Sequence, residues 1–221
     1  MIMPAFRTLR TTLLASAIGL VSLQGFAREG DSAAAATSLA KLQQRWAEIN
    51  YTLPPGEQAT AFSYLGDEAD QLVERYPDAA ELHIWAGIIR STEAGASGGL
   101  GALGLVKQAK KELETALELN PLALDGSAYT SLGALYYQVP GWPLGFGDEQ
   151  KAEWHLQRAL AINPEGIDSL YFWGDYLHEQ GRDAEARQAL ERALMAAPWP
   201  GRELADSGRS DDIRQLMSEL Q

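Results

Sequence analysis

The chain alternates between stretches with apolar residues at helical spacing and short breaks rich in proline and glycine. From Thr37 onward, apolar residues recur three and four positions apart, as on one face of an α-helix. No stretch alternates apolar and polar residues long enough to indicate a strand. Prolines close four of the helical stretches, at intervals of 44, 43 and 34 residues: Pro77, Pro121, Pro164 and Pro198. The pattern predicts an all-α protein built from repeated helix pairs.

The unit at residues 167–198 matches a 34-residue helix-pair repeat at every expected position. Gly174 and Ala186 are small where the two helices should cross closely. Larger apolar residues should fill the space around that crossing: Trp173, Leu177 and Leu190. The unit therefore predicts two antiparallel helices in close contact.

Two longer units precede it and fit the same frame once an insertion between their helices is removed. Ala86 and Gly133 take the small position at the crossing. The insertions are GASGGLGALG at 95–104 and VPGWPLGFG at 139–147. Extra residues between the helices of a pair cost little, because the entropy of loop closure grows slowly with length.

A weaker unit comes first, with helices near 37–50 and 57–76. At the other end, Ser210 followed by two aspartates is typical of a helix start and predicts a C-terminal helix. That helix should cover the apolar flank of the last repeat, which a solenoid needs for solubility.

Residues 79–198 resemble the tetratricopeptide repeat (TPR) superfamily, on the positions just described. The resemblance implies a right-handed α-solenoid of about four helix pairs with a C-terminal capping helix. The segment from Leu132 through Trp142 to Leu160 also resembles the TPR-containing T component of TRAP transporters. Those proteins are periplasmic, often lipid-anchored, and are proposed to help capture apolar solutes. This chain has no cysteine that could carry a lipid.

The N-terminus has the layout of a cleavable secretory signal peptide. Arg7 and Arg10 precede an uncharged apolar run that ends at Leu23, and small residues lead up to a cleavage position after Ala27. The alternative, a membrane anchor, needs about 20 apolar residues, more than this run supplies. We expect the leader to be removed, with no stable membrane insertion afterwards.

The predicted organisation has three parts: a signal peptide at 1–27, a flexible lead-in at 28–36 and a helical-repeat domain at 37–221. The lead-in is assigned because its residues are small and polar with no periodicity. The predicted location of the mature protein is the periplasm or the exterior of the cell.

Charge and composition exclude several classes of function. The formal net charge is −12, and it falls to −14 once the two leader arginines are removed. Nucleic acids and anionic lipid surfaces attract basic proteins, so neither is an expected partner.

The absence of cysteine excludes disulfides and cysteine-based metal sites or nucleophiles. His83, His155 and His178 do not form a metal-binding spacing, and no catalytic or phosphate-binding motif occurs. We expect no cofactor, no metal and no enzymatic activity.

A TPR array exposes a concave groove lined by the first helix of each pair. Positions 2, 5, 9 and 12 of those helices predict a ligand- or partner-binding groove that consists of His83, Arg90, Thr130, Tyr137, Asp168, Tyr171, Asp175 and His178. Most tryptophans are instead expected in the core: Trp46, Trp85, Trp154 and Trp173. Trp199 is expected to pack under the C-terminal helix.

The second insertion is stiff and aromatic, since it combines two prolines with Trp142 and Phe146. The two aromatic side chains either pack against the neighbouring repeat and fix the loop, or form a lid at a binding site. The sequence leaves both interpretations open.

Three functional hypotheses follow. The first is an adaptor of the cell envelope that holds a protein or peptide in its groove. The second is a soluble auxiliary of a solute-uptake system that encloses a small apolar ligand, either as a single chain or as an oligomer. A closed cavity would favour the auxiliary and an open groove the adaptor. The third, an enzyme, has no supporting group of residues.

Overall fold

The computed structural model describes residues 17–99 and 101–220. Within them the regular structure is helical, apart from one isolated bridge between Gly141 and Gly147. The elements are α1 (Ala17–Thr52), α2 (Pro55–Arg75), α3 (Ala80–Ser97), α4 (Ala102–Leu119), the 3-10 turn η1 (Ala123–Gly126), α5 (Ser127–Gln138), α6 (Glu149–Ile162), α7 (Ile167–Glu179), α8 (Asp183–Leu194) and α9 (Glu203–Glu219).

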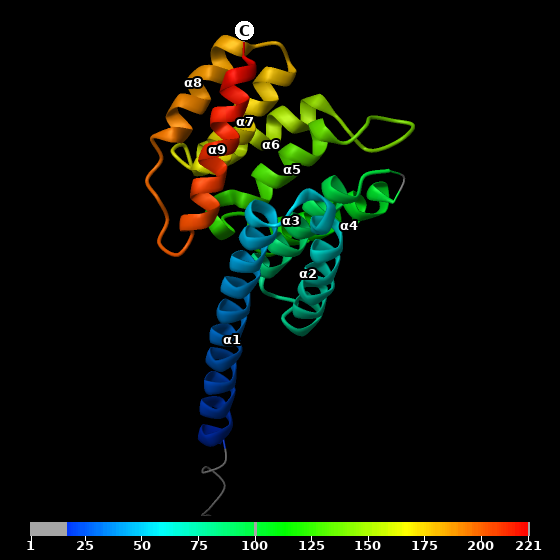
Figure 1. Ribbon diagram of the computed structural model, residues 1–221. Coiled ribbons are helices and arrows are strands. Elements are labelled where there is room, and N and C mark those ends of the chain that lie inside the picture. The colour runs from blue at the N-terminus through cyan, green and yellow to red at the C-terminus, as the bar shows by residue number, and fades with distance from the viewer. Residues whose placement is uncertain (1–16, 100, 221) are drawn as a thin grey trace, which may run out of the picture.

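The helices form consecutive antiparallel pairs that stack into a solenoid (Figure 1). The pairs are α1–α2, α3–α4, α5–α6 and α7–α8, and α9 follows the last of them. This arrangement confirms the predicted all-α repeat architecture. The first insertion is shorter than predicted, because α3 continues to Ser97 and α4 begins at Ala102. Gly98 and Gly99 make the turn with positive φ angles, a conformation that favours glycine.

The same close crossing occurs in three successive pairs. A Cβ atom on Gly87, Gly133 or Gly174 would lie 2.6–2.8 Å from the Cγ of a leucine on the partner helix. The leucines are Leu113, Leu156 and Leu190. The prediction for Gly174 is confirmed, but the frame of the α3–α4 unit is wrong by one residue. Gly87, not Ala86, stands at its crossing.

Helix α1 continues through the segment predicted as a flexible lead-in. Residues 28–36 are helical, and the side chains of residues 31–34 are exposed. Alanine has the highest helix propensity of any residue, and the lack of periodicity in this alanine-rich run reflects a helix with no buried face. Among the side chains of α1 that the structure describes, those of Ala35 and Leu39 are the first to pack against the core.

The first 16 residues, which carry most of the predicted leader, lie outside the described part of the chain. In the part that is described, no helix combines the length and apolar character needed to cross a bilayer.

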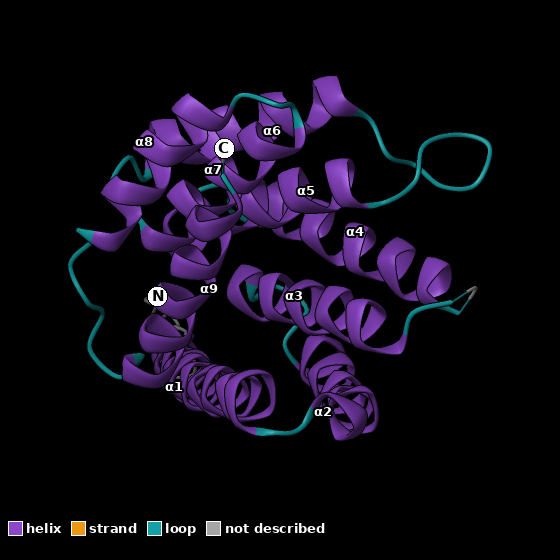
Figure 2. Ribbon diagram, turned by 45° about the horizontal axis from the view of Figure 1, so that its top comes forward, coloured by secondary structure: helices purple, strands orange, loops and turns teal. Residues whose placement is uncertain are grey.

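The last helix closes the solenoid on itself. Ile213 and Leu216 of α9 pack into a hydrophobic cluster with Leu190 and its neighbours, as expected for a capping helix. Helix α9 also contacts α1 (Figure 2). Ser210 lies inside α9 rather than at its start, because the helix begins seven residues earlier, at Glu203.

The α1–α9 contact centres on Tyr51. Its hydroxyl donates a hydrogen bond to Asp212, with an O–O distance of 3.3 Å. Its ring lies against Gly208, where a Cβ atom would be 2.3 Å from a ring carbon. The two ends of the repeat array therefore meet, and the concave face is bounded on the side where an open solenoid would leave it free.

Replacing Gly174 with leucine should destabilise the protein by about 1–3 kcal/mol or more, because the added side chain overlaps Leu190 at the crossing. Urea unfolding followed by circular dichroism measures this loss. Gly104→Leu is the matched control, since no atom beyond its own stretch of helix lies within 4 Å of a Cβ at that position. Equal stability of the two variants would show that the crossing is not close-packed.

Candidate functional site

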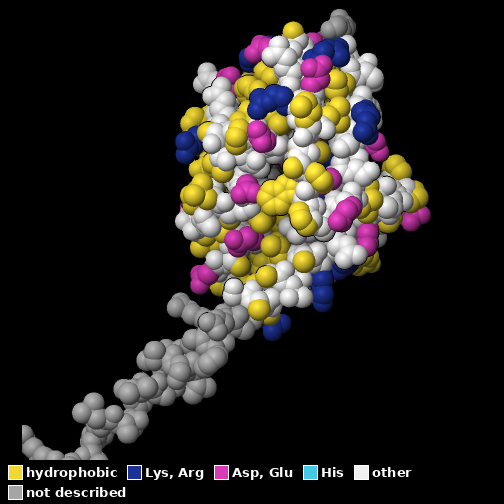
Figure 3. All heavy atoms as spheres, turned by 90° about the vertical axis from the view of Figure 1, so that its left-hand side faces the viewer, with side chains coloured by type: hydrophobic (Ala, Val, Ile, Leu, Met, Phe, Trp, Pro, Cys, Tyr) yellow, Lys and Arg dark blue, Asp and Glu magenta, His cyan; other side chains and the backbone are white. Residues whose placement is uncertain are grey.

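Helices α1, α3 and α5 and the segment that connects α8 to α9 surround one large cavity. Its volume is about 1300 Å³, above the roughly 300–1,000 Å³ that is usual for small-molecule pockets. The walls come from α1, α3 and α5, the beginnings of α4 and α7, and the α8–α9 connection at residues 195–202. Figure 3 shows hydrophobic side chains interspersed with acidic ones on the face that this connection crosses.

Aromatic side chains form much of the central wall. Trp46 of α1 and Trp85 of α3 meet edge to face, with ring centroids 5.7 Å apart. The indole nitrogen of Trp46 donates to the Thr92 hydroxyl at 3.0 Å, which fixes the ring against α3. Phe172 of α7 and Trp199 of the α8–α9 connection also line the cavity. These rings offer broad apolar contact surface with few rotatable bonds.

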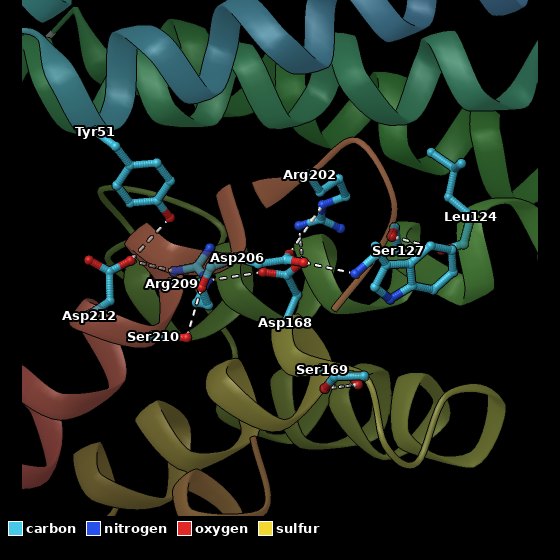
Figure 4. A network of polar contacts seen from close by, with 12 residues as sticks. Tyr51, Leu124, Ser127, Asp168, Ser169, Arg202, Asp206, Arg209, Ser210 and Asp212 are labelled. Atoms are coloured by element: carbon cyan, nitrogen blue, oxygen red, sulfur yellow. Dashed lines mark hydrogen bonds and ion pairs between the residues drawn. The ribbon is translucent and has the colours of Figure 1, made fainter. Parts of the chain in front are cut away.

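A network of ion pairs stands at the end of the cavity where α7 begins (Figure 4). Asp168 accepts hydrogen bonds from Arg202 and Arg209, both at 2.9 Å. Arg209 also donates to Asp212, which in turn accepts from Tyr51. The network thus joins α7 to both ends of the solenoid.

The surroundings of Arg209 hold the guanidinium in one place. Only 12% of its side chain is exposed, and its guanidinium carbon lies 4.3 Å from the centroid of the Tyr171 ring. A cation over an aromatic face is attracted by the ring quadrupole. Burial raises the pKa of Asp168, but the charges of Arg209 and Arg202 outweigh burial, so that the pKa lies below its ordinary value. Asp168 is therefore a carboxylate in the neutral pH range.

Of the predicted groove residues, only Thr130 and Asp168 line the cavity. His83 and Arg90 lie instead between helices, each about 5% exposed. The one-residue error in the frame of the α3–α4 unit explains this. Shifting the frame by one moves the Arg90 position to Ser91, which does line the cavity, and the His83 position to Ile84, which is buried.

His83 and Arg90 each join neighbouring helices. The imidazole of His83 contacts a Glu112 carboxylate oxygen at 2.7 Å and the Pro77 carbonyl at 2.9 Å. Arg90 binds carboxylates of α2 and of its own helix: Asp67, Asp70 and Glu93. Gly66 leaves room for that guanidinium, since a Cβ there would lie 2.3 Å from a guanidinium nitrogen.

The other four predicted groove residues lie outside the cavity wall. The Tyr137 hydroxyl donates to Asp175 at 2.5 Å, which connects α5 to α7. His178 pairs with Asp183 at the turn into α8. Tyr171 faces Arg209. Of the groove positions of α7, only Asp168 lines the cavity, and the other three contact side chains of α5, α8 and α9.

The two aromatics of the second insertion have different surroundings. Phe146 packs edge to face on Tyr136, with ring centroids 5.7 Å apart, and lies near the Lys110 ammonium. Trp142 is 89% exposed. Neither lines the cavity, whereas Pro140 and Leu144 of the same insertion do. Phe146 thus packs against the repeats, and the insertion contributes to the wall through other residues.

Sequence reasoning missed most of the wall. Trp46 and Trp85 are buried, as predicted, but they also face the cavity. Trp199 is 45% exposed and contributes to the wall. Trp154 is 54% exposed and not in the core, because α6 buries the stripe of Ala152, Leu156 and Ala159 and Trp154 lies beside that stripe. The sequence carried one signal of the cavity, the run of small residues at the end of α3. Small side chains leave space beside the helix.

Among the described residues, no group of three or more histidine, aspartate or glutamate side chains has a geometry that could hold a metal ion. His155 stacks on Tyr136, and burial lowers its pKa to about 4, so the imidazole is neutral at neutral pH.

Comparison with known proteins establishes the fold. No family model matches the sequence, and no curated protein matches it either. Among solved structures, the chain is similar to a thermophilic TPR protein of Thermus thermophilus, with a TM-score of 0.54 and 20% sequence identity. The match covers 90% of this chain and 95% of that one. The protein therefore has a TPR-like helical-repeat fold.

Protonation of His83 should stabilise the protein. The hydrogen bond to Glu112 raises the pKa of His83 above 6.5, despite burial. The stabilisation is therefore complete below the unfolded-state pKa of about 6.5 and is lost as pH rises through the higher folded-state pKa. Urea unfolding of the wild type and of His83→Gln across this range should show a stability difference that shrinks as pH rises. A constant difference would contradict the assignment.

Replacing Asp168 with asparagine should cost about 1–3 kcal/mol, because two guanidiniums lose their shared carboxylate in a partly buried site. Asp211→Asn is the control. Its carboxylate is 75% exposed and pairs with an exposed arginine, so its loss should cost about 0–1 kcal/mol. Thermal unfolding of both variants makes the comparison, and equal losses would mean that the Asp168 network does not stabilise the fold.

Proposed function

We propose that the protein is a non-enzymatic binding protein that holds a small, predominantly apolar ligand inside the solenoid. The observation that carries this proposal is the cavity of about 1300 Å³ with aromatic walls. Burial of apolar surface contributes roughly 25 cal/mol per Å², so a ligand that fills part of this space gains enough to bind without any covalent chemistry.

The α1–α9 contact favours a small ligand over a folded protein in the same space. A protein partner on a TPR-like array needs an open concave face, and here the contact of Tyr51 with Gly208 and Asp212 bounds that face. The α8–α9 connection adds Trp199 and Pro200 to the wall. Access to the interior is restricted to what fits between these segments.

We also propose export to the periplasm and a role as an auxiliary of solute uptake. The layout of Arg7, Arg10 and the following apolar run supports a leader. Cleavage after Ala27 would leave intact the packing of Ala35 and Leu39 against the core. The acidic net charge fits a protein that does not adhere to anionic membrane surfaces.

An adaptor role is a second candidate, supported by a different surface. The tip of the second insertion presents Trp142 to solvent, 89% exposed and outside the cavity wall. Large exposed apolar side chains on a protruding loop are typical of protein contact sites. In Figure 1 this loop extends away from the stacked helices, so it could contact a partner while the cavity is occupied.

An uncharged apolar dye such as N-phenyl-1-naphthylamine should bind the mature protein with increased fluorescence. Ser131→Trp should weaken this binding at least about tenfold, because Ser131 lines the cavity and an indole there occupies part of it. Ser218→Trp is the matched control, since Ser218 is exposed on α9, and it should bind the dye like the wild type.

Two results would contradict ligand binding in the cavity: no dye binding by the wild type, or equal weakening by both serine variants. Unfolding curves of both variants show whether they are folded. If the dye does not bind while a crosslinker at position 142 captures one defined envelope protein, the adaptor role replaces the proposed one.

A further inference from the structure

We infer that the ligand of this cavity is an amphiphile with an apolar tail and an uncharged, hydrogen-bonding head. The inference rests on the proposed function and adds to it the chemical class of the ligand. It follows from how apolar, polar and charged side chains are distributed between the two ends of the cavity.

One end of the cavity is apolar. It lies where α3 and α5 end and α4 begins, and its wall includes Ala94, Leu103, Val106, Val139 and Leu144. No charged residue lines this end among the described residues. Gln138 is a polar residue of this part of the wall, and its amide nitrogen donates to Tyr137 and Asp175. An ion placed here would lose its hydration without meeting a side chain of opposite charge. This end therefore accepts a hydrocarbon tail.

The opposite end carries hydroxyl and amide groups. It lies where α5 and α7 begin, and its wall includes Ser127, Asn163 and Ser169. Thr130 and Ser131, one turn further along α5, also line the cavity, and neither hydroxyl is hydrogen-bonded to another described residue. The hydroxyls of Ser127 and Ser169 donate to backbone carbonyls and offer a ligand acceptor lone pairs. Those of Thr130 and Ser131 can both donate and accept, so the set matches an uncharged head such as an alcohol or an amide.

The charges at this end compensate one another. The wall contains two carboxylates and two guanidiniums, from Asp125, Asp168, Arg202 and Arg209. Asp206 and Asp212 bind the same arginines from behind the wall. An anionic head would have to displace a carboxylate from these arginines and would meet excess negative charge. An ammonium head would have to compete with guanidiniums for Asp168, which leaves an uncharged head as the best match.

The two ends are far enough apart for a tail and a head to be bound separately. Ser127 and Val139 mark the polar and apolar ends along α5. Twelve residues of helix at 1.5 Å each separate them by about 18 Å. A medium-length alkyl chain with one terminal head group can extend through this distance.

Displacement of the bound dye by four decyl compounds tests the inference: decan-1-ol, decanoate, decylammonium and headless decane. We expect decanol to displace the dye at the lowest concentration, with an affinity at least about tenfold above those of the two ions and above that of decane.

Asp125→Asn is the informative variant, because it removes a wall carboxylate that pairs with no arginine among the described residues. Asparagine also tolerates the left-handed backbone at this position. It should raise the affinity for decanoate relative to decanol about threefold or more.

The possible outcomes separate this inference from the proposed function. Tightest binding of decanoate or decylammonium overturns the uncharged head, and so does an Asp125→Asn variant with an unchanged decanoate-to-decanol ratio. Equal binding of decane and decanol means that the head is not recognised, while the apolar cavity remains a binding site. If no decyl compound displaces the dye and the wild type does not bind the dye, the proposed function fails as well.

Discussion

The architecture depends on the contact that joins the last helix to the first. Tyr51 lies 161 residues before Asp212, and their hydrogen bond bridges the ends of the solenoid. Arg209 extends the junction to α7 through Asp168. Repeat arrays hold together through contacts between neighbouring units, so a contact between their ends is an additional constraint that turns a groove into a partly enclosed space.

The junction is polar although the repeats around it are held by hydrophobic packing. Two separate hydrophobic clusters form the core, one mainly from α1–α6 and the other mainly from α7–α9. Charged groups in partly buried positions require nearly complete pairing, and the guanidiniums of Arg202 and Arg209 share the Asp168 carboxylate for this reason. The pairing holds α9 in place against α7 and α1. It also determines the electrostatic character of one end of the cavity.

Helical periodicity was sufficient to predict the helix pairs, because each helix buries one stripe of apolar residues against its partner. The crossing at Gly174 and Ala186 was read correctly for the same reason. The frame of the α3–α4 unit was not, since Ala86 and Gly87 are both small and only the packing of Leu113 selects the second. A shift of one residue turns a helix by about 100°, which is why His83 and Arg90 were assigned to the groove although they lie between helices.

The sequence by itself determined the all-α repeat fold, the pairing of the helices and the absence of cysteine chemistry, because these follow from local periodicity and composition. Only the tertiary structure decided which faces of α1, α3, α5 and α7 enclose the cavity, and that α9 returns to α1. Those features depend on contacts between residues such as Tyr51 and Gly208, which are distant in the sequence and carry no local pattern. The aromatic walls of the cavity and the paired charges near the start of α7 could not be predicted without knowing that α9 contacts α1.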